Sequence, residues 1–207
     1  MTKAVYVADI GDDIDDLVAI KYLQSISRLE CVVLDGKSVD QSRIAELEKA
    51  NIKIVDAIPS STRVVFCGGA FTAVSNYIKH SKLDLFVANG FFAGVGVVAE
   101  ADILPKFAGL INCRSYNPEL DVIAAAEIIY SRRGIDQLSY FVSKNVCHHK
   151  DNIVGKWHKE QFNCKPNKKL HDVLMVKEGI NILDKRDTLC DYEAVRIYRE
   201  ANNKWSC

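Results

Sequence analysis

The sequence predicts an α/β fold, an open and mostly parallel sheet with helices on both faces. Short, almost continuously apolar segments alternate along the chain with segments whose apolar residues recur at helical spacing. Apolar runs without polar alternation are typical of parallel strands that are buried on both faces. The chain has 207 residues, of which 48% are hydrophobic, and this is enough for one core. We therefore expect residues 1–207 to form a single domain.

Six apolar, β-prone segments predict strands. The first precedes an aspartate-rich segment, the third runs into Gly68-Gly69, and the fourth runs into a glycine-rich stretch at residues 89–96. Ligands of open parallel sheets bind in the loops beyond the carboxyl ends of the strands, so these loops are the candidate sites. The predicted strands are residues 4–7, 31–34, 63–67, 83–88, 138–142 and 194–198, the last as an edge strand.

Five segments predict helices, because their apolar residues return every three or four positions. In the first of them, Leu17, Ile20 and Leu23 lie on one face. The polar stretch 145–167 has no such pattern, and we interpret it as a lid or an insertion. The predicted helices are residues 14–26, 41–50, 72–79, 121–131 and 169–179.

Composition and charge favour a small-molecule ligand. The chain has 27 basic and 27 acidic side chains, so no excess charge draws it to nucleic acid or to an anionic membrane. It has no apolar stretch of about 18 residues that could span a bilayer, and Asp9 interrupts the first apolar run before a signal-peptide core is complete. Seven cysteines without CxxC spacing are typical of reduced thiols. We therefore expect a cytoplasmic protein.

The segment after the first strand carries five aspartates within eight residues, at positions 9, 12, 13, 15 and 16. An acid at a helix N-terminus gains about 0.3–1 kcal/mol from the helix dipole, which explains one or two of them. Crowded carboxylates raise one another's pKa or require a cation, and hard oxygen donors favour Ca²⁺ or Mg²⁺. The spacing lacks the glycine and the glutamate of an EF-hand loop. The residues themselves therefore favour a metal site over helix capping.

The same segment resembles the N-terminal signature Asp-x-Asp-x-Gly-x-Asp-Asp of the inosine-uridine-preferring nucleoside hydrolases. Asp9, Asp15 and Asp16 match this signature. Gly11 stands where the family has its second aspartate, which is both a Ca²⁺ ligand and the base for the attacking water. Four further segments resemble family segments in the same order along the chain: residues 69–72, 116–125, 143–148 and 169–174.

The resemblance implies roles for individual residues. Ca²⁺, in preference to Mg²⁺, would be held by the side chains of Asp9, Asp16 and Asp172 and by the backbone carbonyl of Thr72. The substrate would be held by Asp15 and Asn117 at the ribose, and by Asn145 and His148 near the base. In catalysis, Asp12 or Asp13 would replace the carboxylate that is lost at Gly11, and His171 would protonate the leaving base.

The resemblance also implies a Rossmann-like core and a hydrolase of nucleoside salvage, which cleaves the N-glycosidic bond of ribonucleosides or of a related nucleoside or nucleotide. Such cleavage passes through an oxocarbenium-like transition state, and a metal that chelates the ribose diol also positions the attacking water. One alternative is a protein that binds metal and ribose without turnover; it is favoured by Gly11 and by Ser115, which replaces a family glutamate. A second is an N-glycosidase for a nucleotide or a modified nucleoside. A homo-oligomer, which is common in the family, is a further open alternative.

Overall fold

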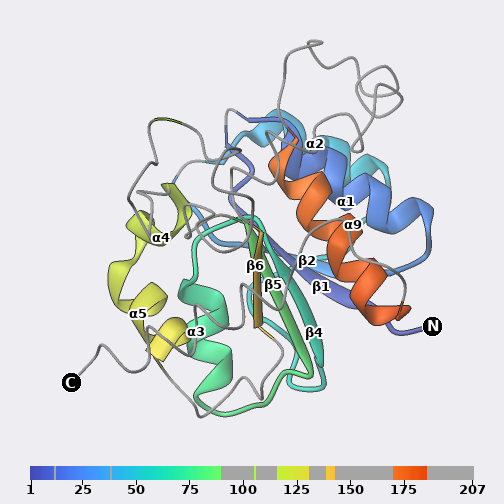
Figure 1. The fold of residues 1–207 in the computed structure, drawn as a ribbon. Helices are drawn as coiled ribbons and strands as arrows, with labels where there is room; N and C mark the ends of the chain where they lie inside the picture. The colour runs from blue at the N-terminus through green and yellow to red at the C-terminus, as the bar shows by residue number, and fades with distance from the viewer. Residues whose placement is uncertain are drawn as a thin grey trace.

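Six parallel strands form one sheet in the order β3-β2-β1-β4-β5-β6, flanked by helices (Figure 1), which confirms the predicted fold class. The computed structural model describes residues 1–11, 13–37, 39–89, 105, 116–130, 139–142 and 170–185. The strands are β1 (Ala4–Ala8), β2 (Leu29–Leu34), β3 (Ile54–Val55), β4 (Val64–Cys67), β5 (Leu85–Asn89) and β6 (Ser139–Val142). The helices are α1 (Asp15–Ser25), α2 (Gln41–Lys49), α3 (Thr72–Ile78), α4 (Tyr116–Leu120), α5 (Val122–Tyr130) and α9 (His171–Leu183).

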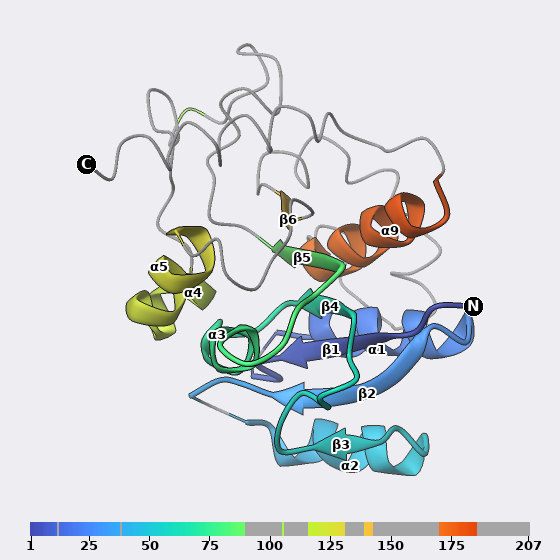
Figure 2. The ribbon, with the colours of Figure 1, turned by 90° about the horizontal axis from the view of Figure 1, so that it is seen from below.

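Helices cover the sheet on two sides. α1 and α9 lie side by side on one side, and α3 and α5 lie together on the other (Figures 1 and 2). Figure 2 shows the strands following one another from β3 to β6. Because both faces are covered, every residue of β1 and of β4 is buried, as expected for parallel strands.

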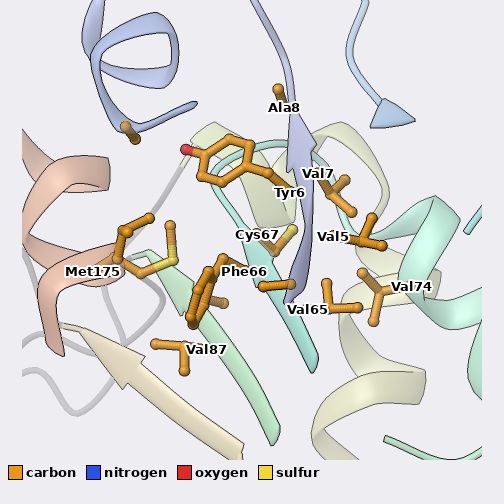
Figure 3. Close-up of a cluster of buried hydrophobic side chains, with 14 of the residues drawn as sticks. Val5, Tyr6, Val7, Ala8, Val65, Phe66, Cys67, Val74, Val87 and Met175 are labelled. Carbon is orange, nitrogen blue, oxygen red and sulfur yellow. The ribbon is translucent and has the colours of Figure 1, made fainter. Parts of the chain in front are cut away.

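Side chains of β1 alternate between the two layers. Tyr6 lies on the side of Met175 from α9, whereas Val5 and Val7 turn to the other side, towards Val74 of α3 (Figure 3). Phe66 of β4 packs on the α9 side, directly against Gly179. The two layers bury one continuous hydrophobic core on both faces of the sheet.

The strand order creates a switch point between β1 and β4. From β1 the chain adds β2 and β3 on one side, then returns to add β4, β5 and β6 on the other. The loops that follow β1 and β4 therefore diverge, and open α/β sheets bind their ligands in the crevice between such loops. Here these loops contain Asp9 and Gly68.

The observed elements lie close to the predicted ones. Five predicted strands and the first four predicted helices agree to within two residues at each end. The predicted helix end at Gly179 is wrong, because α9 continues to Leu183; the ring of Phe66 fills the space that a side chain at 179 would need. The sequence patterns missed the short elements β3 and α4. The predicted edge strand 194–198 and the polar stretch 145–167 lie outside the described residues.

No helix among the described residues is long and apolar enough to cross a membrane. Of the seven cysteines, the described Cys31 and Cys67 are buried and carry free thiols.

Candidate carboxylate site

Two buried carboxylates from the two ends of the described chain lie together at the end of β4. Asp16 is the second residue of α1 and Asp172 the second residue of α9, and their side chains are 2% and 3% exposed. A Cβ atom added at Gly68 would lie 2.5 Å from Asp16 Oδ1 and 2.9 Å from Asp172 Cγ. Glycine at position 68 therefore allows both acids to approach the switch point.

Neither acid serves as a helix cap. The N-cap residues are Ile14 in α1 and Leu170 in α9, and neither helix has a side-chain cap hydrogen bond. Both acids lie in the first turn of their helices, where the helix dipole favours negative charge. The two helices therefore direct positive ends towards the carboxylates without giving them the N-cap geometry.

Each of the two carboxylates receives a hydrogen bond from a strand residue. The Tyr6 hydroxyl of β1 donates to Asp16 Oδ1 at 2.9 Å. Asn89 Nδ2, at the end of β5, donates to Asp172 Oδ1 at 2.7 Å. Bonds of this kind orient carboxylates that bind a cation.

The electrostatic environment disfavours two neighbouring negative charges. Burial raises the pKa of Asp16 well above its usual range, and the carboxylate of Asp172 raises it further. Burial and the charge of Asp15 likewise raise the pKa of Asp172, although the bond from Asn89 opposes this shift. Burial also raises the pKa of Asp9, which accepts a hydrogen bond from the carboxyl group of Asp16. Such a group retains a proton or binds a cation.

The chemistry of the donors fits a hard divalent cation, because all three groups offer carboxylate oxygens. In the arrangement described, however, no three His, Cys, Asp or Glu side chains of the described residues could hold a metal ion between them. The side chains of Asp9 and Asp16 lie close enough for each to shift the pKa of the other. A hard cation at this point would be held by Asp16 and Asp172, with Asp9 beside them.

Four other predicted site residues lie in the same segments or next to them. Asp13 is exposed, its Oδ1 accepts a long hydrogen bond from the Asp15 amide at 3.4 Å, and its charge raises the pKa of both Asp9 and Asp172. Asp15 is buried beside Asp16. Asn117 of α4 donates from Nδ2 to the carbonyl of Gly68. His171 is the first residue of α9, adjacent to Asp172 in the chain.

Thr72 lies in a second polar group. Its hydroxyl donates to Asp121 Oδ2 at 2.9 Å, and the next amide, of Ala73, donates to Asp35 Oδ2 at 2.7 Å. Thr72 is also the first residue of α3. Its carbonyl oxygen therefore points along the helix, where a carbonyl accepts a hydrogen bond from the amide four residues later. Three predicted residues, Asp12, Asn145 and His148, lie outside the described residues.

The sequence patterns did not identify Tyr6, Asn89 and Arg43 as parts of the site. A signal existed for Asn89, since a polar residue at the carboxyl end of an apolar strand faces the ligand edge of a parallel sheet. A weaker signal existed for Tyr6, because a buried tyrosine hydroxyl needs a hydrogen-bond partner. Arg43, on α2, contacts the aspartate-rich segment, and its position within a polar helix gave no signal.

Comparison of the chain with protein-family models, with curated proteins and with solved structures found no match.

Proposed function

We propose that this chain binds a divalent cation, Ca²⁺ in preference to Mg²⁺, beside Asp16 and Asp172 and hydrolyses the N-glycosidic bond of a ribonucleoside. One observation carries the proposal. Two buried carboxylates from helices at the two ends of the described chain converge on Gly68 at the switch point of the sheet. Burying two adjacent acids without a positive partner is costly. These two carboxylates lie together at the end of the sheet where ligands of parallel sheets bind, which supports a bound cation.

Bound Ca²⁺ would supply a grip on the ribose diol and lower the pKa of a water molecule. Asp16 and Asp172 would hold it, each kept in orientation by its hydrogen bond from Tyr6 or Asn89. Asp15 and Asn117 are the residues that we assign to the ribose hydroxyls. Asn117 is tied to the Gly68 carbonyl, which keeps its amide at the same edge of the sheet.

Asp13 is the described residue best suited to act as the base. It is exposed, so its carboxylate is open to water, and its negative charge raises the pKa of both Asp9 and Asp172. A positioned general base contributes roughly 10²- to 10⁴-fold to a rate. In the proposed reaction the oxygen of water bonds to the sugar carbon as the C–N bond breaks. The water gives one proton to Asp13, and the leaving base takes a proton from His171.

The second candidate function is a protein that binds Ca²⁺ and ribose without turnover. Gly11 favours it, because the family places its catalytic aspartate at this position. Its backbone carbonyl accepts a hydrogen bond from Arg43.

The test is a hydrolysis assay on inosine, uridine and a nitrophenyl riboside, with Ca²⁺ or with EDTA. We expect turnover that chelation abolishes. Asp13→Asn should lower kcat by about 10²-fold or more, and Asp12→Asn tests the other candidate base. His171→Gln should slow inosine more than the nitrophenyl riboside, whose leaving group needs no proton.

Asp84→Asn is the matched control. Asp84 directly precedes β5, at the amino ends of the strands and thus at the end of the sheet opposite the site, and it pairs with Arg63 on the surface. This variant should therefore retain wild-type rates. Calcium-dependent thermal stabilisation without turnover on any riboside supports the binding protein instead. Full activity in EDTA, or in the Asp12→Asn/Asp13→Asn double variant, contradicts the proposed chemistry.

A further inference from the structure

Arg43 of α2 joins two carbonyl groups of the aspartate-rich segment. Its guanidinium group donates to the carbonyl oxygens of Gly11 and of Asp13. These two carbonyls flank residue 12 in the sequence. A planar guanidinium presents several N–H groups in a fixed fork, so one side chain can hold both oxygens at a fixed separation.

The start of α2 holds Arg43 in place. Asp40 caps this helix by accepting hydrogen bonds from the Ser42 amide at 2.9 Å and the Ser42 hydroxyl at 2.6 Å. Arg43 Nε lies 3.5 Å from Asp40 Oδ2. The backbone amide of Asp40 also donates to the Ile10 carbonyl at 2.8 Å. The cap of α2 and the segment 10–13 are therefore connected through three carbonyl groups.

The segment needs such a connection because its own charges repel. Asp9, Asp13 and Asp15 act on one another or on Asp172 across the site, and repulsion between like charges favours a more open loop. The positive charge of the Arg43 guanidinium, bound to two backbone carbonyls of this segment, counteracts this repulsion.

We propose that Arg43 is a positioning residue, which holds the Gly11 and Asp13 carbonyls and so fixes the backbone that carries the Asp13 carboxylate. The consequence for catalysis rests on the proposed function, whereas the restraint on the loop does not. Arg43 touches neither substrate nor cation in this scheme. It acts through the backbone that carries the base.

The test compares Arg43→Gln and Arg43→Lys with Arg63→Gln in the full-length chain with Ca²⁺. Arg63 is the control, since its guanidinium pairs with Asp84 at 3.2 Å at the amino ends of the strands, opposite the site. Two quantities are measured: amide hydrogen exchange of residues 10–15, and kcat and KM on the nitrophenyl riboside.

For Arg43→Gln we expect exchange of residues 10–15 to accelerate about tenfold or more. We expect kcat to fall about tenfold or more, while KM stays within about threefold, because the substrate and cation grips are intact. In both exchange and kcat, Arg43→Lys should lie between the wild type and Arg43→Gln, since an ammonium group is a cation without the planar fork. Arg63→Gln should match the wild type in both measurements.

Unchanged exchange in Arg43→Gln overturns the proposal. A fall in kcat together with a rise in KM and a fall in melting temperature, equally large in Arg43→Lys, also overturns it, because this is the result of general destabilisation. If the wild-type chain turns over no riboside, the proposed function fails, and the exchange measurement still decides whether Arg43 restrains the loop.

Discussion

The aspartates that precede α2 and α5 differ in burial and in pKa from the aspartates in the first turns of α1 and α9. Asp40 and Asp121 precede α2 and α5, and each accepts a backbone hydrogen bond from its own helix: from the Ser42 amide and from the Ala124 amide, both at 2.9 Å. The Ser42 hydroxyl and amide lower the pKa of Asp40, and chiefly the Ala124 amide lowers the pKa of Asp121. Asp16 and Asp172 accept bonds from Tyr6 and Asn89, but burial raises the pKa of both.

The difference separates acids that serve the fold from acids that, as we propose, serve a ligand. A cap carboxylate satisfies amide groups that a helix leaves free, and it stabilises the helix in return. Asp16 and Asp172 cap nothing, and as neighbouring charges they disfavour each other's ionisation. An arrangement that costs stability persists where function needs it.

The largest effect is expected from Asp16→Asn and Asp172→Asn. Each removes a carboxylate from the proposed cation site, so turnover should fall by about 10³-fold or more. Calcium should also no longer stabilise the fold, whereas in the wild type it should add about 2.7 kcal/mol at a hundred times its Kd. Riboside hydrolysis and thermal unfolding with Ca²⁺ or EDTA measure both effects.

Asp84→Asn again provides the control, because it makes the same change on the surface at the amino ends of the strands. An asparagine side chain resembles a protonated aspartic acid in shape and charge. In EDTA at neutral pH, Asp16→Asn and Asp172→Asn should therefore be at least as stable as the wild type. A clear loss of stability in EDTA would mean that the two aspartates hold the fold together, as the capping aspartates do.

Periodicity predicted most of the fold because each element depends on its own residues. The fully apolar run of β1 and the helical spacing of Leu17, Ile20 and Leu23 are local signals. The site was predictable only where a whole motif stands in the chain, as with Asp15-Asp16 and His171-Asp172.

The remaining parts of the site depend on the order of the strands. Tyr6 reaches Asp16, and Asn89 reaches Asp172, because β1 and β5 both flank β4. No periodic pattern reports this order. The second polar group around Thr72 depends on it too, since Asp35 follows β2 and Asp121 precedes α5.

A smaller effect is expected in the pH dependence of the cation-free chain. The pKa values of Asp9, Asp16 and Asp172 are raised in the folded state, whereas an unfolded aspartate has a pKa near 3.9. Between the two values the folded chain binds more protons, so these groups make the fold less stable as pH rises through this window. Thermal unfolding in EDTA from about pH 5 to 8 measures the trend for the cluster.

Under the proposed function calcium should reverse this trend, because it would compete with protons for the same carboxylate oxygens. The melting temperature with excess Ca²⁺ should exceed that in EDTA by a margin that grows with pH, and the Asp16→Asn/Asp172→Asn double variant should show no such margin. A margin that is constant across the pH range, or that shrinks as pH rises, contradicts proton displacement at these carboxylates.

The smallest effect is expected from the cap before α5. Asp121→Ala removes the acceptor of the Ala124 amide and of the Thr72 hydroxyl. Because the carboxylate is partly exposed, we expect a loss of about 1 kcal/mol or less, and a fall in melting temperature of about 2–4 °C at most. The pKa of Asp121 is lowered in the folded state, so its contribution is present above the unfolded pKa and is lost as pH falls through the folded one. At about pH 8 in EDTA, Asp121→Ala should therefore melt below the wild type, whereas Asp16→Asn should melt at or above it. A shift of both melting temperatures in the same direction would contradict the distinction between the capping Asp121 and the buried Asp16.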